Sequence, residues 1–323
     1  MVELVDEELN VMVYIFGVIK KSLVTTSFLL KIMLPMMLLS RVLELAGVAD
    51  WLSKILSPPL AAMGLPGEAG IIWAVTLLTN LYGGIGVLVT LLPTNELTIG
   101  QLSILSSVML FAHGLPVEQA VVRAAGASAV FTGLLRVFAA ITYGICANYL
   151  FNLFGIMQEP VSINWMPEAS VDDSWLHWIK GVIEIMALMF TIITAINFTI
   201  DFLERVGILK WLSRQLEPLM RITGQNPLLA PMTTIGLLLG LSYGGGLIIQ
   251  KVSEINFSRR DLFMSLSFLS LLHSLIEDTL IMLLLGADIW VILFGRMLFA
   301  IIILALLSKI ADCFLFKEAQ PTT

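Results

Sequence analysis

Charge is scarce in this chain. Only 13% of its 323 residues are charged, whereas a soluble domain carries roughly a quarter. Hydrophobic residues make up 58% of the chain, and the mean hydropathy is +0.94. This composition excludes a soluble enzyme and a disordered protein. We predict an all-α polytopic membrane protein, because β-barrels alternate polar and apolar residues instead of running apolar for ~20 residues.

Cysteine and basic residues are also few. The two cysteines, Cys146 and Cys313, exclude a disulfide scaffold and a four-thiolate metal site. The net charge of −6 gives no basic field for nucleic acid. Neither a P-loop nor an H-E-x-x-H motif occurs. The G-x-S-x-G pattern at 240–244 lies in an apolar segment with no preceding strand. We therefore expect no enzyme activity, no catalytic residues and no cofactor.

Long apolar segments fill most of the chain. Two amphipathic stretches, Asp50–Met63 and Lys210–Ile222, are too short to span a membrane. One polar, acidic stretch, Gln158–Trp178, divides the chain near its middle. We predict an N-terminal membrane repeat at 1–153, a linker at 154–180 and a C-terminal membrane repeat at 181–323. The apolar segments cover about 23–46, 69–93, 99–115, 126–153, 181–208, 228–250, 262–286 and 287–308.

The two halves share motifs at a constant offset in residue number, which indicates a duplication. Trp51-Leu52-Ser53 matches Trp211-Leu212-Ser213 at an offset of 160, and Tyr82-Gly83-Gly84 matches Tyr243-Gly244-Gly245 at 161. The offset of 160 returns for His113 and His273, and again for Arg136 and Arg296. A constant offset over such a long stretch is hard to obtain by chance.

Basic residues indicate that the repeats are inverted. Arg41 and Lys54 flank the Tyr-Gly-Gly segment of the first copy, whereas seven Lys and Arg residues flank that of the second. Cytoplasmic loops carry the Lys and Arg excess. We expect an external linker, cytoplasmic termini and a multi-pass location in a bacterial cytoplasmic (inner) membrane. Each copy then has about three spanning helices, a broken or re-entrant hairpin segment and an amphipathic interfacial helix.

Glycine pairs inside apolar runs mark the hairpin segments. Two or three adjacent glycines favour a helix break, and inside a bilayer freed backbone groups must face protein or a watery cavity. Close helix packing is the alternative. We favour a break at Tyr-Gly-Gly that binds substrate. The candidate substrate-binding residues are Asn80, Tyr82, Gly83, Gly84, Ser242, Tyr243, Gly244 and Gly245.

Paired units with an amphipathic helix and a Gly-Gly segment resemble the nucleoside-recognition (Gate) domain family of bacterial membrane proteins. The motifs that carry this resemblance are Tyr82-Gly83-Gly84 and Tyr243-Gly244-Gly245. The resemblance implies a transporter-like fold whose hairpins meet near the membrane midplane. The family includes spore-maturation membrane proteins, and similar units occur in ferrous-iron and concentrative nucleoside transporters. This chain has no cysteine near either Gly-Gly and no GTPase domain, which argues against a role in iron uptake.

A second set of candidates combines histidines with buried charge. Charge at membrane depth costs at least ~2.5–3.5 kcal/mol, so it is normally paired or lines a pathway. We expect Arg136 to pair with Glu118, and Arg296 with Glu277 or Asp278. A structural ion pair is the alternative to a site. Two histidines and carboxylates could bind a divalent cation if the copies converge, but no ligand set is complete in the sequence, so we assign no metal. The candidate coupling and gating residues are His113, Glu118, Arg136, His273, Glu277, Asp278 and Arg296.

These features favour a transporter that moves a small polar solute or ion by alternating access, coupled to protons or to another cation. The alternative is a non-transporting membrane scaffold or assembly protein of the spore-maturation type. The expected partners are the lipid bilayer and a small-molecule or ion substrate, without nucleic acid. The sequence leaves open whether the chain forms a homo-oligomer.

Overall fold

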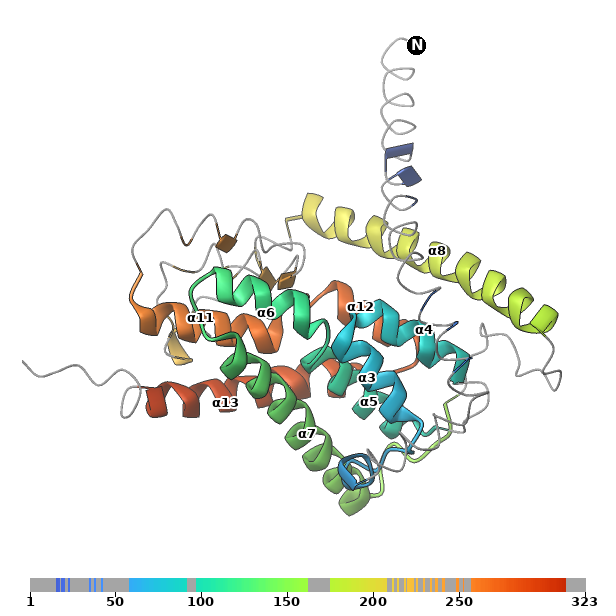
Figure 1. The fold of residues 1–323 in the computed structure, drawn as a ribbon, viewed down its shortest axis with the longest axis horizontal. Helices are drawn as coiled ribbons and strands as arrows, with labels where there is room; N and C mark the ends of the chain where they lie inside the picture. Colours follow the sequence, from blue (N-terminus) through green and yellow to red (C-terminus); the bar gives the residue numbers. More distant parts are fainter. Residues whose placement is uncertain are drawn as a thin grey trace, which may run out of the picture.

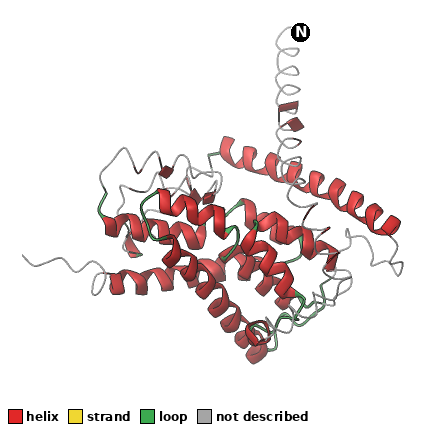
Figure 2. Ribbon diagram, viewed as in Figure 1, coloured by secondary structure: helices red, strands yellow, loops and turns green. Residues whose placement is uncertain are grey.

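The chain folds into packed helices in the computed structural model (Figures 1 and 2). The structure describes residues 58–91, 97–161, 175–207 and 257–311, with single positions and short runs between and before them. In these ranges no strand occurs, and the one isolated β-bridge joins Thr98 to Pro160. The described helices are α3 (Ala69–Leu78), α4 (Leu81–Leu91), α5 (Ile99–Phe111), α6 (Leu115–Ala124), α7 (Ala129–Phe154), α8 (Trp175–Arg205), α11 (Arg259–Leu272), α12 (Glu277–Leu284), the π-helix η3 (Trp290–Gly295) and α13 (Arg296–Ile310).

Four helical spans in the described part are long and apolar enough to cross a membrane: Ile99–Ala124, Ala129–Phe154, Arg259–Leu284 and Trp290–Ile310. The protein is therefore an all-α polytopic membrane protein, as the composition predicts. The first and third spans are mostly buried, whereas only 33% of each of the other two is buried. Large apolar side chains such as Leu134, Phe138 and Leu298 lie on the exposed faces. An apolar exposed face of this kind suits lipid contact.

Equivalent residues begin the two buried spans. The Thr98 hydroxyl caps α5 by accepting a hydrogen bond from the backbone N–H of Gln101. The Gln101 side chain in turn accepts a hydrogen bond from the backbone N–H of Thr98. Ser258, the equivalent residue of the second repeat, caps α11 by accepting from the N–H of Asp261. Hydroxyl caps satisfy helix N–H groups that have no partner within the helix. The same cap therefore fixes the same helix start in both repeats.

Each buried span is interrupted halfway along. In the first repeat α5 ends at Phe111 and α6 begins at Leu115, and in the second α11 ends at Leu272 and α12 begins at Glu277. Gly114 has φ of 54° in the first break, and Ser274 has φ of 49° at the equivalent position of the second. The φ of Ser274 lies in the left-handed region, which is uncommon for a residue other than glycine. Its backbone N–H is held by the carbonyl of Gly236, as the N–H of Gly114 is by that of Thr76.

The ends of α6 and α12 match as well. Gly126 follows α6 with φ of 93°, and Gly286 follows α12 with φ of 96°. Glycine adopts this conformation without the steric penalty that a Cβ brings, so it ends helices readily. Each glycine turns the chain into the next span, which is α7 in the first repeat and η3 with α13 in the second.

The Tyr-Gly-Gly segment of the first repeat does not itself form the helix break, so this part of the prediction is wrong. The interruption lies just before it, at Thr79 and Asn80, and residues 82–84 belong to the first turn of α4. The Asn80 side chain accepts a hydrogen bond from the backbone N–H of Gly83 at 2.8 Å and so caps α4. A side-chain cap, rather than glycine flexibility, starts the second helix of this hairpin.

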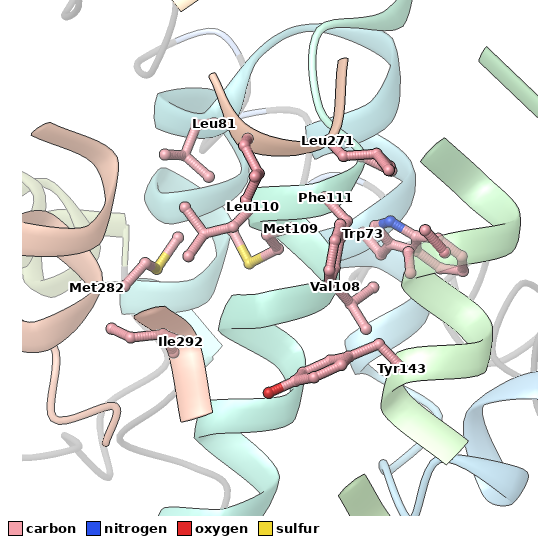
Figure 3. Close-up of a cluster of buried hydrophobic side chains, with 14 of the residues drawn as sticks. Trp73, Leu81, Val108, Met109, Leu110, Phe111, Tyr143, Leu271, Met282 and Ile292 are labelled. Carbon is pink, nitrogen blue, oxygen red and sulfur yellow. The ribbon is translucent and has the colours of Figure 1, made fainter. Parts of the chain in front are cut away.

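Helices of both repeats share one hydrophobic core. Figure 3 shows Val108 and Phe111 of α5 and Tyr143 of α7 in one cluster with Met282 of α12 and Ile292 of η3. The Tyr143 hydroxyl donates a 2.6 Å hydrogen bond to the carbonyl of Val291 in η3. A π-helix leaves some carbonyls without their usual helical partners. The tyrosine of one repeat thus satisfies a carbonyl in the other.

Candidate functional site

His113 and His273 meet between the two repeats. Their Nε2 atoms lie 2.9 Å apart, and their ring centroids lie 4.7 Å apart. Each residue sits at the interruption of its span, just past the midpoint. Each Nδ1 atom lies 2.9 Å from a carbonyl four residues earlier, that of Met109 for His113 and that of Leu269 for His273. The two histidines therefore have equivalent surroundings, and both are buried.

Glu118 joins the histidine pair to Arg136. The carboxylate forms a buried ion pair with the guanidinium of Arg136, which confirms that predicted pair. The same carboxylate lies 3.2 Å from Nε2 of His273 and 3.4 Å from Nε2 of His113. Arg136 also donates through Nε to the carbonyl of Phe111 at 2.8 Å, where α5 ends. One arginine thus holds both the carboxylate and the broken helix end in place.

Asp278 is the counterpart of Glu118 in the second repeat, at the same offset that relates the two histidines. One carboxylate oxygen of Asp278 lies 3.7 Å from Nε2 of His113, and the side chain is buried. Each repeat therefore contributes one histidine and one carboxylate to the same cluster. We call these four residues the His–carboxylate cluster: His113, Glu118, His273 and Asp278.

The predicted pair between Arg296 and Glu277 or Asp278 is not formed. Arg296 donates through Nη2 to the carbonyls of Leu271 and His273, at 3.1 and 3.4 Å, and lies over the Phe111 ring. Glu277 instead accepts a 2.5 Å hydrogen bond from the hydroxyl of Tyr82. Among the described residues no ion pair joins Arg296 to either carboxylate. The partner of Glu277 lies in the other repeat, whereas the prediction considered only partners within the same repeat.

The Tyr-Gly-Gly candidates of the first repeat have defined structural contacts. A Cβ at Gly84 would collide with the Thr76 hydroxyl, and one at Gly83 with that of Thr79. These glycines therefore allow α4 to approach α3 closely, which is the packing alternative. Their role in substrate binding stays a prediction, as does that of Asn80 and Tyr82. Ser242, Tyr243, Gly244 and Gly245 lie outside the described residues.

Three donor residues fit a metal centre by geometry. One potential ligand atom from each of His113, Glu118 and His273 lies within 4.8 Å of the others, and all three residues are buried. The sequence contains both histidines but no sign that they touch, because they lie in different halves of the chain. The constant offset was the one available signal, since it marks the two histidines as equivalent residues of a duplicated unit. It also relates Asp278 to Glu118.

Residues 27–128 match the model of a protein family described as nucleoside recognition, named Gate. The matched residues lie within the N-terminal repeat. This confirms the family resemblance that the Tyr-Gly-Gly motifs predict. The residues that match the Gate model include α3 to α6, and with them His113 and Glu118 of the cluster.

The chain is also similar to a curated bacterial protein beyond the Gate domain. It is 29% identical over 288 residues to "Uncharacterized membrane protein YvoD" of Bacillus subtilis (strain 168). The alignment covers 86% of this chain and 89% of the relative, so it extends over both repeats. No solved structure matches the chain. The chain is thus a multi-pass membrane protein with a segment similar to the Gate family in its N-terminal repeat.

Proposed function

We propose that the protein moves a small polar solute or ion across the membrane by alternating access, with the His–carboxylate cluster as its central site. The observation that carries this proposal is the meeting of two interrupted spans at a buried polar cluster. Breaks halfway along membrane spans are a feature of transporters, where they form the binding site near the midplane. The cytoplasmic membrane, cytoplasmic termini and external linker expected from the sequence remain part of the proposal.

The energetic cost of the cluster supports a functional role. Carboxylates and guanidinium groups in a membrane interior are costly even when paired, and they commonly mark a substrate or ion pathway. A lock between helices could be built more simply from apolar side chains. The breaks also remove intrahelical hydrogen bonds at membrane depth, which is tolerated where protein or water supplies partners. Both costs fall at the same place in this fold.

Accessibility from both sides of the membrane tests the proposal without a known substrate. We suggest Ser274→Cys, directly after His273, in a background with Cys146 and Cys313 replaced by alanine. An impermeant maleimide should label this thiol in right-side-out vesicles and also in inverted vesicles, because alternating access exposes the site to each side in turn. Leu134→Cys, on an exposed apolar face, is the matched control. It should stay unlabelled, since a thiol in lipid does not form the reactive thiolate.

The scaffold alternative predicts a different pattern. If the cluster is only a structural lock, Ser274→Cys stays unlabelled from both sides, because Ser274 is 8% exposed in the described conformation. Labelling from one side alone would indicate a fixed vestibule rather than alternating access. Either result would contradict the proposed function.

A further inference from the structure

We propose that His113, His273 and Glu118 bind one divalent first-row transition-metal ion between the two repeats, with the Asp278 carboxylate beside them. This names the ligand class of the proposed transport site. Its biological role therefore rests on the proposed function, whereas the binding can be measured separately. The His–carboxylate cluster has two imidazoles and two carboxylates but no thiolate, a donor set that suits zinc, iron, cobalt, nickel and manganese ions.

When both imidazoles are neutral, the hydrogen bonds of the two histidines leave both Nε2 atoms as acceptors. A backbone carbonyl can only accept, so each Nδ1 must be the N–H that donates, to Met109 in one case and to Leu269 in the other. In a neutral imidazole the opposite nitrogen then carries a lone pair. Metal-binding histidines typically donate their second N–H to a carbonyl or carboxylate, which fixes the ring. Both rings of the pair are held in this way.

The ligand atoms of the cluster therefore face one another as acceptors. The two Nε2 atoms are 2.9 Å apart, and carboxylate oxygens approach them at 3.2, 3.4 and 3.7 Å. Ligands at the usual 2.0–2.2 Å from a metal are about 3.0 Å apart in octahedral and about 3.4 Å apart in tetrahedral geometry. The observed separations lie close to these values. A central cation converts the mutual repulsion of the lone pairs into coordination.

A single shared proton accounts for less of this arrangement. One proton can lie between one pair of atoms, for example the two Nε2 atoms, and leaves the other acceptor contacts without a donor. One metal ion can be bound by His113, Glu118 and His273 at once, because their ligand atoms all lie within 4.8 Å of one another. The charges also favour a cation, because Arg136, Arg296, Glu118, Glu277 and Asp278 carry one net negative charge when all are ionised. The four residues of the cluster are at most 5% exposed, so water contributes little.

Zinc binding to the purified full-length chain tests the inference. The protein is prepared without a polyhistidine tag, stripped with a chelator and titrated with Zn²⁺ in detergent by calorimetry. We expect one Zn²⁺ per chain, and a rise in melting temperature because the ion binds the folded state. His113→Gln and His273→Gln should each lower the Zn²⁺ affinity at least about 100-fold, since even loss of an outer partner of a ligand costs 10–100-fold.

His177→Gln is the matched control, because His177 is the third histidine of the chain and belongs to α8. This variant should bind Zn²⁺ as the wild type does. No Zn²⁺ binding by the wild type would overturn the inference, and so would binding that survives both His113→Gln and His273→Gln. If the two histidines share a proton instead of a metal ion, the wild type should not bind Zn²⁺.

X-ray absorption of the Zn²⁺-loaded wild type gives a second test that needs no variant to fold. The spectrum should show two imidazole ligands at about 2.0 Å and oxygen ligands beside them. Fewer than two imidazoles would overturn the inference. The two proposals can also fail separately. Zn²⁺ binding without labelling of Ser274→Cys from either side would support the metal site and contradict the proposed transport. Labelling from both sides without Zn²⁺ binding would support transport and contradict the metal site.

Discussion

Arg136 and Arg296 occupy equivalent positions in the two repeats, yet in the described structure only Arg136 forms an ion pair with a carboxylate. Arg136 reaches Glu118, whereas Arg296 donates to two backbone carbonyls and lies over the Phe111 ring. The residue equivalent to Glu118 is Asp278, whose side chain is one methylene shorter. The duplicated site is therefore asymmetric, with its tightly held carboxylate in the first repeat.

This asymmetry predicts unequal effects of removing the two arginines. Arg136→Met leaves Glu118 charged and buried without its partner, which costs about 3–5 kcal/mol. Arg296→Met leaves two carbonyls without a donor, at about 1–3 kcal/mol. Arg136→Met should therefore lower the melting temperature in detergent more than Arg296→Met. Equal losses would contradict the unequal pairing.

The ion pair itself predicts a rescue. Replacing Glu118 together with Arg136, both by methionine, should destabilise the protein less than Arg136→Met alone, because no unpaired charge remains. The same melting assay measures it. A double variant that is as unstable as the sum of its single variants would show that the two residues do not interact.

Tyr82 and Glu277 connect the Tyr-Gly-Gly segment of one repeat to the α12 helix of the other. We expect Tyr82→Phe and Glu277→Gln to be coupled by about 0.5–3 kcal/mol in a double-mutant cycle on stability, because both changes weaken the same hydrogen bond. Tyr143→Phe, which removes a hydroxyl bonded elsewhere, serves as the control in place of Tyr82→Phe. Additive effects of Tyr82→Phe and Glu277→Gln would contradict a shared bond.

Gly84 predicts a packing effect that a second change relieves. An added methyl group would meet the Thr76 hydroxyl, so Gly84→Ala should cost about 1–3 kcal/mol by overpacking. Thr76→Ala removes that hydroxyl, and the double variant should recover part of the loss in melting temperature. Full stability of Gly84→Ala, or no recovery in the double variant, would show that the helices do not approach closely at this glycine.

Charge predicts the orientation in the membrane. Ser170→Cys, in the acidic stretch, should react with an impermeant thiol reagent from outside, and Ser258→Cys, beside Arg259 and Arg260, from inside. Intact cells and inverted vesicles provide the two measurements, in a background without Cys146 and Cys313. External labelling of Ser258→Cys but not of Ser170→Cys would reverse the orientation.

Features that depend on nearby residues could be predicted from the sequence. Apolar segments of membrane length gave the helical class, and the constant offset between the repeats reappears in the caps Thr98 and Ser258 and in the turns at Gly126 and Gly286. The ion pair of Glu118 with Arg136 could be predicted for the same reason, because the two residues lie in consecutive spans.

Features that depend on the approach of distant segments could not be predicted. Tyr82 bonds Glu277 in the opposite repeat, and His113 likewise meets His273. The helix break before α4 differs from the predicted position because Asn80 supplies a side-chain cap ahead of the glycines. Hydropathy carries no information on which of several polar residues in an apolar run will face one another. A complete ligand set therefore appears only once the two repeats are packed together.

Transport of Zn²⁺ into proteoliposomes tests the central claim most directly, that the site between the repeats carries its ion across the bilayer. Vesicles that contain the purified chain and an entrapped zinc-sensitive dye are exposed to external Zn²⁺. The account predicts saturable influx with the wild type and with His177→Gln, and influx at the level of protein-free vesicles with His113→Gln and with His273→Gln. Wild-type influx no faster than that of protein-free vesicles, or influx that survives both substitutions in the cluster, would contradict it.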